Sequence, residues 1–208
     1  MGRKSGAREL LIDITRLLDR AMQGRRPTGV DRVGLAYIHH FRDRAKALVR
    51  LAGRWVVCSA ADSQHLFDWV VALGGGGTVR MHGLVGKNYA LNWQPPRAGD
   101  ILLNVVHSGL DRADYGNRVR RHGLRALYFL HDLIPIRFPE YSRPGEAERH
   151  RQRLLTMLTT AHGVVVNSLV TGRELEDFAA SQGIPAPDWI VARLAPPALP
   201  PSQVQNLL

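Results

Sequence analysis

Short apolar runs alternate with segments of helical periodicity along most of this chain. The clearest run is Leu124–Leu130, which is rich in aliphatic and aromatic residues and ends directly before His131 and Asp132. Three prolines interrupt residues 135–144, so the polar pair falls in a loop that follows a buried strand. Ligands bind at the carboxyl ends of strands in open parallel sheets, which makes this pair a candidate site.

The same alternation predicts the remaining elements. The strand candidates are residues 9–14, two strands within 47–59 that are split at Gly53, 101–106, 124–130, 163–166 and 189–194. The helix candidates are residues 62–73, 111–122, 145–160 and 169–181, and one further helix that opens at Thr28, where Thr28 and Asp31 have capping-box spacing. Residues 74–89, which begin with four glycines, are predicted to form a surface loop. Nearly continuous apolar strands that alternate with helices predict an α/β fold, with a parallel sheet and helices on both faces.

Size and composition agree with a globular protein that can bury a core. The chain has 208 residues and 45% hydrophobic residues, which suits one large α/β domain or two small ones. The single cysteine, Cys58, is expected to be buried in a strand and has no partner for an intrachain disulfide. No apolar signal region or membrane-spanning run is visible, so we expect a cytoplasmic protein.

The charge balance is strongly basic. Lys and Arg number 28 against 18 Asp and Glu, and every basic residue except Lys4, Lys46 and Lys87 is arginine. Arginine suits planar phosphate and carboxylate groups, although a GC-rich genome explains the bias equally well. A basic nucleic-acid-binding domain is therefore an alternative, but helix-turn-helix, RRM-like and zinc-finger patterns are missing from the sequence, and nucleic acid is not expected as a partner.

Four segments, in order from Leu10 to Phe178, carry a family resemblance. They are LLIDITRL with RRPTGVDRVGLAYIHHF, then GDILLNVVHSGLD, HDLIPIRFPEYSRPGE and GVVVNSLVTGRELEDF. Together they resemble the N-terminal, acceptor-side half of bacterial GT-B glycosyltransferases of the family 4 type. The resemblance implies a single Rossmann-like GT-B half over residues 1–195. Residues 196–208 would then form a proline-rich linker towards an absent second domain.

The resemblance also implies a function. The chain would be the acceptor-binding half of a retaining, nucleotide-sugar-dependent glycosyltransferase of the hexosyltransferase type, in envelope or capsular polysaccharide biosynthesis. The nucleotide-sugar is the donor substrate, bound by a missing C-terminal domain or a separate chain, and no metal or other cofactor is implied. The acceptor is a sugar, with a lipid-linked sugar as one option, and the chain alone is expected to be inactive. A non-catalytic interaction domain derived from the GT-B fold is the alternative.

Polar residues at the strand ends are the candidate site. The resemblance gives His131 the catalytic position, where it would donate to a hydroxyl of the transferred sugar or acceptor; the alternative is a histidine that caps its own turn. Asp132 is interpreted first as a turn residue that bonds nearby backbone N–H groups. Ser168 is interpreted as a helix cap that still faces the cleft. The candidate substrate-binding residues are Gly29, Arg16, His107, Ser108, Asp132, Asn167 and Ser168, with Arg16, Arg25 and Arg26 on a loop over residues 15–28.

The helix over residues 145–160 has two interpretations. Its first half is basic, with Arg149, Arg151 and Arg153, and its second half is apolar. Such a helix could lie on an anionic leaflet, which would give peripheral contact with the inner membrane. The preferred interpretation is a surface helix whose leucines pack in the core. His39 and His40 are expected at the surface.

Overall fold

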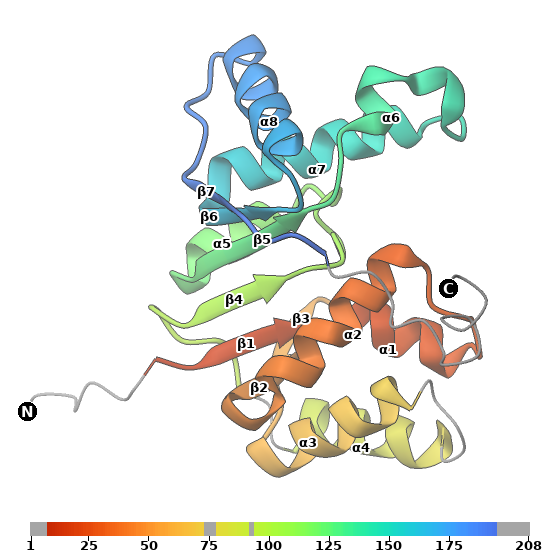
Figure 1. Cartoon of the computed structure of the whole chain (residues 1–208). Coiled ribbons are helices and arrows are strands. Elements are labelled where there is room, and N and C mark those ends of the chain that lie inside the picture. Colours follow the sequence, from red (N-terminus) through yellow and green to blue (C-terminus); the bar gives the residue numbers. More distant parts are fainter. Residues whose placement is uncertain (1–7, 73–77, 92–93, 195–208) are drawn as a thin grey trace, which may run out of the picture.

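A single seven-stranded sheet organises the computed structural model, which describes residues 8–72, 78–91 and 94–194 (Figure 1). The strand order is β3-β2-β1-β4-β5-β6-β7, and all neighbouring strands are parallel except β2 and β3. The strands are β1 (Leu10–Asp13), β2 (Ala45–Leu51), β3 (Arg54–Val57), β4 (Ile101–Asn104), β5 (Arg125–Leu130), β6 (Ala161–Val166) and β7 (Trp189–Val191). The predicted Rossmann-like α/β class is confirmed, with one antiparallel edge strand.

Helices connect all consecutive strands except β2 and β3, which form a hairpin. The helices are α1 (Thr15–Met22), α2 (Gly29–Phe41), α3 (Ala60–Val71), α4 (Thr78–Ala90), α5 (Tyr115–His122), α6 (Ile134–Arg137), α7 (Glu146–Thr160) and α8 (Leu169–Ser181), with 3-10 turns at Arg42–Arg44 and Pro139–Tyr141. The chain leaves β1 towards β2 on one side, whereas β4 leads to β5 on the other. The gap between β1 and β4 is therefore the point where the strand order reverses, and ligands of open α/β sheets bind above such a point.

Helices cover both faces of the sheet, as predicted, and bury two apolar clusters. Leu103 of β4 belongs to the cluster that contains apolar residues of α1 to α4, among them Ile38 and Phe67. Leu102 belongs to the other cluster, which contains Leu154 of α7 and Phe178 of α8. Successive side chains of a strand point to opposite faces, so these adjacent leucines anchor the two layers.

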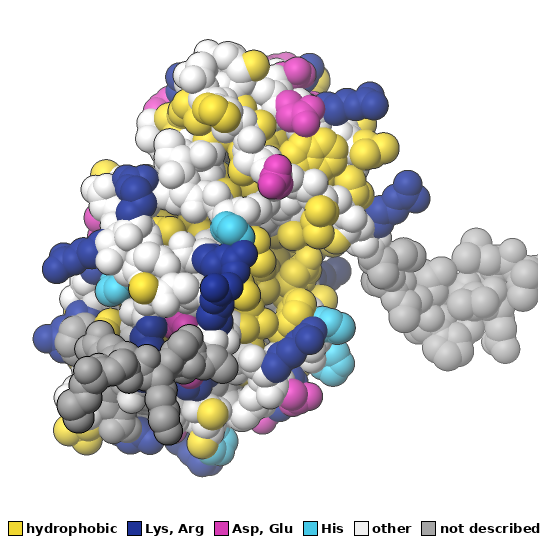
Figure 2. Space-filling model, turned by 90° about the vertical axis from the view of Figure 1, so that its left-hand side faces the viewer, with side chains coloured by type: hydrophobic (Ala, Val, Ile, Leu, Met, Phe, Trp, Pro, Cys, Tyr) yellow, Lys and Arg dark blue, Asp and Glu magenta, His cyan; other side chains and the backbone are white. Residues whose placement is uncertain are grey.

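On the face of the sheet that carries Phe129, the helices do not extend over the last strand, β7. Phe129 of β5 is fully buried, and Tyr37 of α2 packs against it edge-on with ring centroids 5.8 Å apart. Phe129 is paired in register with Val165 of β6, which in turn is paired with Ile190 of β7. Ile190 is 66% exposed, so this cross-strand row passes from the core to the surface. Apolar side chains also form a band on the surface shown in Figure 2.

The prediction of a surface loop over residues 74–89 was wrong for its described part. Residues 78–90 form α4, whereas residues 74–77 lie outside the described residues. Met81, Val85 and Asn88 follow one another at helical spacing and are all buried. This periodicity outweighs the glycines that suggested a loop.

The predicted loop over residues 15–28 was also wrong in its first part, because Thr15–Met22 forms α1. Leu17, Leu18 and Ala21 give this short helix a buried face. The helix predicted from Asp111 begins only at Tyr115. The two strands predicted within residues 47–59 are the antiparallel pair β2 and β3, which turn at Gly53 with a φ of +76°.

The burial of several side chains agrees with the sequence predictions. The apolar side chains of α7, Leu154, Met157 and Leu158, are buried, so the interpretation as a surface helix packed on the core is confirmed. Cys58 is buried, and His39 and His40 are exposed, as expected. Among the described residues, no helix combines the length and apolarity required to traverse a bilayer. The predicted linker over residues 196–208 lies outside the described residues.

Candidate functional site

The ends of β4, β5 and β6 are joined by side chains that sequence analysis selected. Asn167, directly after β6, donates from Nδ2 to the backbone oxygen of His131 at 2.7 Å. His131, directly after β5, bonds through Nε2 to the backbone oxygen of Val105 at 2.8 Å. His107 bonds through Nε2 to the backbone oxygen of Phe129 at 2.6 Å. The parallel strands thus bring His107, His131 and Asn167 together at one edge of the sheet.

A third histidine, which sequence analysis did not select, completes a cluster. The ring centroid of His107 lies 5.1 Å from that of His131 and 6.0 Å from that of His150 on α7. Nε2 of His150 bonds to the backbone oxygen of Asp132 at 2.9 Å. A carbonyl oxygen can only accept, so each Nε2 in this cluster must carry the proton. Each neutral ring then keeps Nδ1 as an acceptor.

The electrostatics of the cluster favour neutral rings. Burial lowers the pKa of His107 well below its ordinary value, and the nearby His131 and His150 lower it further. Burial likewise lowers the pKa of His131 and of His150, although the carbonyl partners oppose this shift. At neutral pH each ring can therefore accept a hydrogen bond from a hydroxyl, but it resists protonation and offers little positive charge to an anion.

A buried ion pair lies beside the point where the strand order reverses. Arg50 of β2 donates from Nε to Oδ2 of Asp13, the last residue of β1, at 2.8 Å. Its guanidinium group also bonds to the hydroxyl of Ser108, which follows β4. Burial alone would lower the pKa of Arg50, but Asp13, Tyr115 and Asp114 together more than offset this effect and raise it. A permanent cation thus ties together the loops that follow β1 and β4.

The loop after β4 is built around this arginine. Ser108 exchanges two backbone hydrogen bonds with the side chain of Asn104, at 3.1 and 3.0 Å, and Asn104 also donates to the hydroxyl of Tyr115 at 2.9 Å. Gly109 has a φ of +71°, and a Cβ there would overlap the Arg50 guanidinium. Only glycine satisfies both conditions, so the loop closes directly on Arg50.

Two further candidates, Arg16 and Gly29, belong to a separate network. Asp31 is almost fully buried and accepts from Nε of Arg16 at 2.9 Å, while Arg20 lies equally close to its other oxygen. Thr28 and Asp31 form the predicted capping box of α2. A carboxylate thus holds Nε of Arg16, and within the described residues no hydrogen bond or ion pair joins this network to the histidines. Gly29 is the first residue of α2, and a Cβ added there would meet no atom within 4 Å, so no neighbour requires glycine at this position.

The remaining candidates have structural partners. Oδ1 of Asp132 accepts from the backbone N–H of Ile134 at 3.0 Å, which confirms the interpretation as a turn residue. Ser168 caps α8 by accepting from the backbone N–H of Thr171 at 3.1 Å, as predicted. Asn167 also accepts from the hydroxyl of Thr171 at 2.9 Å. These contacts are local to each loop, and the bond from Asn167 to the backbone oxygen of His131 joins the loop after β6 to the loop after β5.

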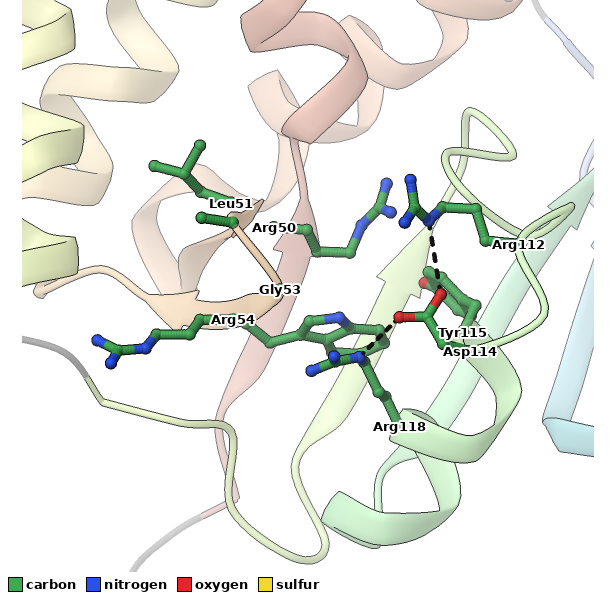
Figure 3. A pocket seen from close by; sticks show the side chains of 10 residues that line it. Arg50, Leu51, Gly53, Arg54, Arg112, Asp114, Tyr115 and Arg118 are labelled. Carbon is green, nitrogen blue, oxygen red and sulfur yellow. Dashed lines mark hydrogen bonds and ion pairs between the residues drawn. The ribbon is translucent and has the colours of Figure 1, made fainter.

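Sequence analysis missed a cavity at the same edge of the sheet. It has a volume of about 300 Å³ and lies between the β2–β3 hairpin and the start of α5 (Figure 3). Its lining residues are Arg50, Leu51, Ala52, Gly53, Arg54, Trp55, Arg112, Asp114, Tyr115 and Arg118. The sequence did contain a signal for this region: Asp13 and Arg50 are charged residues within apolar strands. Charged side chains are rarely buried without a partner, so their positions indicated a buried ion pair.

Comparisons with known protein families, curated proteins and solved structures find no match to this chain. The fold and the site alone define its class, a Rossmann-like α/β domain with a polar site at the carboxyl edge of its sheet. In the described part of the chain, no group of three or more His, Cys, Asp or Glu side chains is arranged to hold a metal ion.

Proposed function

We propose that this domain is the acceptor-binding half of a retaining glycosyltransferase that uses a nucleotide-sugar donor in envelope or capsular polysaccharide assembly. The observation that carries the proposal is the meeting of His107, His131 and Asn167, from the ends of three neighbouring strands. All three come from segments that resemble family 4 N-terminal domains. The nucleotide of the donor is expected on a second Rossmann-like domain, on the same chain or a separate one.

The chemistry of sugar transfer suits these side chains. The transition state resembles an oxocarbenium ion, while negative charge gathers on the departing diphosphate. The single N–H of a neutral His131 is already donated from Nε2 to the backbone oxygen of Val105, so it is not available to a sugar hydroxyl, contrary to the expectation from the sequence. The role proposed for His131 is therefore that of an acceptor, with Nδ1 accepting a hydrogen bond from a sugar hydroxyl. Positive charge at the same edge of the sheet comes from Arg50 of β2, which is paired with Asp13 and is separated from β5 by β1 and β4.

A non-catalytic interaction domain is the second candidate, and one observation favours it. Nε2 of His131, Oδ1 of Asp132 and Oγ of Ser168 each bond to the backbone of their own or a neighbouring loop. The His131 side chain is also buried, with 7% exposure. These contacts could serve folding alone, so the two candidates must be separated by activity.

Gene replacement in the native cells separates them. Membranes from cells that lack the gene are incubated with radiolabelled nucleotide-sugars, and incorporation into lipid-linked and polymeric products is measured. We expect incorporation of one sugar to be lost on deletion and restored by the wild-type chain. His131→Ala should fail to restore it, whereas the exposed control Arg149→Gln should succeed.

Two outcomes would contradict the proposal. Unchanged incorporation of every sugar after deletion would exclude a glycosyltransferase role in these products. Full restoration by a folded His131→Ala chain would clear this histidine of any role in transfer. The folded state of each variant is checked by its circular dichroism spectrum and its urea midpoint.

A further inference from the structure

We propose that the cavity between the β2–β3 hairpin and the start of α5 binds a small molecule through its phosphate group. This inference does not rest on the proposed function, because it concerns binding of an anion and requires no sugar transfer. Three features of the cavity favour such a ligand: its guanidinium groups, the contacts that hold them in place and its size.

Guanidinium groups from two parts of the chain converge on this cavity. Arg50 comes from β2, whereas Arg112 and Arg118 come from the loop before α5 and from α5 itself. The side chains of Arg50 and Arg112 point toward one another, as Figure 3 shows. Like charges in this orientation repel, and an anion between them would turn the repulsion into attraction.

The acidic groups nearby leave an excess of positive charge. Asp114 is the single carboxylate in the lining, and it is shared between Nε of Arg118 at 3.0 Å and Nε of Arg112 at 3.5 Å. Asp13 pairs with Arg50 from the sheet side. Three guanidinium groups thus face two carboxylates. The guanidinium group of Arg54, which also belongs to the lining, points away from the cavity and lies over the ring of Tyr89, 4.9 Å from the centroid.

Arg50 is held in a fixed orientation before any ligand arrives. Its Nε is bonded to Asp13, its guanidinium group to Ser108, and it lies 5.3 Å from the ring centroid of Tyr115. Trp55 packs against Tyr115 with ring centroids 4.9 Å apart, so aromatic rings form one wall. A fixed cation beside an apolar wall binds an anion more strongly than a mobile surface cation, because little side-chain entropy is lost and solvent screens the pair less.

The size of the cavity and the type of cation indicate the class of ligand. A volume of about 300 Å³ is at the lower end of the range for small-molecule sites. The planar guanidinium group of arginine presents N–H donors whose spacing matches the oxygens of a phosphate group. Two such groups can donate to different oxygens of the same phosphate. A phosphate or a monosaccharide phosphate fits these conditions.

Calorimetric titration of the full chain at low ionic strength tests the proposal. The probes are inorganic phosphate and glucose 1-phosphate, and the indole N–H signal of Trp55, assigned with Trp55→Phe, reports whether they enter the cavity. We expect saturable binding that shifts this signal. Arg112→Gln and Arg118→Gln should each weaken binding about tenfold or more, as expected for the loss of a hydrogen bond between charged groups.

Arg149→Gln is the matched control. Arg149 is an exposed arginine on α7 that pairs with Glu146 at 2.8 Å and does not line the cavity, so its loss should leave the affinity unchanged. Tighter binding of glucose 1-phosphate than of phosphate would support a sugar phosphate, and equal binding would support recognition of phosphate alone. Failure of both probes to saturate the wild-type chain, or equal affinities in the wild type and both cavity variants, would overturn the proposal.

Discussion

Nε of Arg50 lies 2.8 Å from Oδ2 of Asp13, and this ion pair joins β2 to the end of β1 in the interior of the protein. The Asp13 side chain is fully buried and that of Arg50 is 13% exposed. The same arginine reaches Ser108 after β4, so one guanidinium group joins β2, the end of β1 and the loop after β4 at the carboxyl edge. Both proposals involve this edge, and the stability of the pair is the first property to test.

Asp13→Asn should destabilise the protein by about 3–5 kcal/mol, because it leaves the buried Arg50 without its counter-charge. The free energy of unfolding from urea titration measures the loss. Glu9→Gln is the matched control, since Glu9 pairs with Lys46 at 2.6 Å but both side chains are about 30% exposed. That pair should contribute at most about 1 kcal/mol. Equal losses in the two variants would refute the central role of Asp13.

Two glycines in helices should respond in opposite directions to alanine. A Cβ at Gly34 of α2 would lie 2.6 Å from Cγ1 of the buried Val106, so Gly34→Ala should lose about 1–3 kcal/mol to overpacking. Gly86 of α4 has open space around its missing Cβ, so Gly86→Ala should gain up to about 1 kcal/mol of helix propensity. Thermal melting of both variants checks the signs, and stabilisation by Gly34→Ala would be evidence against this packing of α2.

The fold was predictable because buried strands appear in the sequence as apolar runs, and the helices between them appear as apolar residues at helical spacing. The errors arose where local composition opposed tertiary packing. Glycines before α4 suggested a loop, yet Met81 and Val85 bury that helix. Residues 15–22 were too few for a convincing helical pattern, and burial of Leu17 and Leu18 decides their structure.

The sequence predicted the site residues that directly follow strands, but not the pairs that the tertiary fold brings together. Strand ends identify His107, His131 and Asn167, because parallel strands must end at the same edge. The partners of Arg50 and His150 are set by the tertiary fold: Asp13 is 37 residues away from Arg50 along the chain, and the backbone oxygen of Asp132 is 18 residues away from His150. No pattern in the sequence specifies such pairs.

Stability should fall as the pH drops from 7.5 to about 5, because the unfolded chain protonates its histidines first. Burial lowers the pKa of His107, His131 and His150 below the ordinary value of 6.5, so their contribution is complete above that pH and declines below it. His150→Gln, which keeps a donor for the Asp132 oxygen, should reduce the decline, by at most about 2 kcal/mol between pH 6.5 and 5. Urea midpoints at both pH values give the comparison.

The control for this pH dependence is His39→Gln, which changes an exposed histidine on α2. It should leave the decline between pH 7.5 and about 5 unchanged, because this side chain is exposed and lies outside the histidine cluster. Carboxylates with lowered pKa values, such as Asp62 and Glu146, lose their contribution only at lower pH. A wild-type stability that stays constant over this interval would show that the histidine cluster is protonated as easily as free histidine.

Truncation along the row that crosses β5, β6 and β7 should reveal where the helical cover ends. Phe129→Ala removes a fully buried ring that Tyr37 contacts, and should cost about 3–5 kcal/mol. Ile190→Ala changes a side chain that is 66% exposed, and should cost no more than about 0.5 kcal/mol. Free energies of unfolding from urea titration measure both losses. A loss at Ile190 as large as that at Phe129 would mean that this end of the row is covered in solution, contrary to the structure.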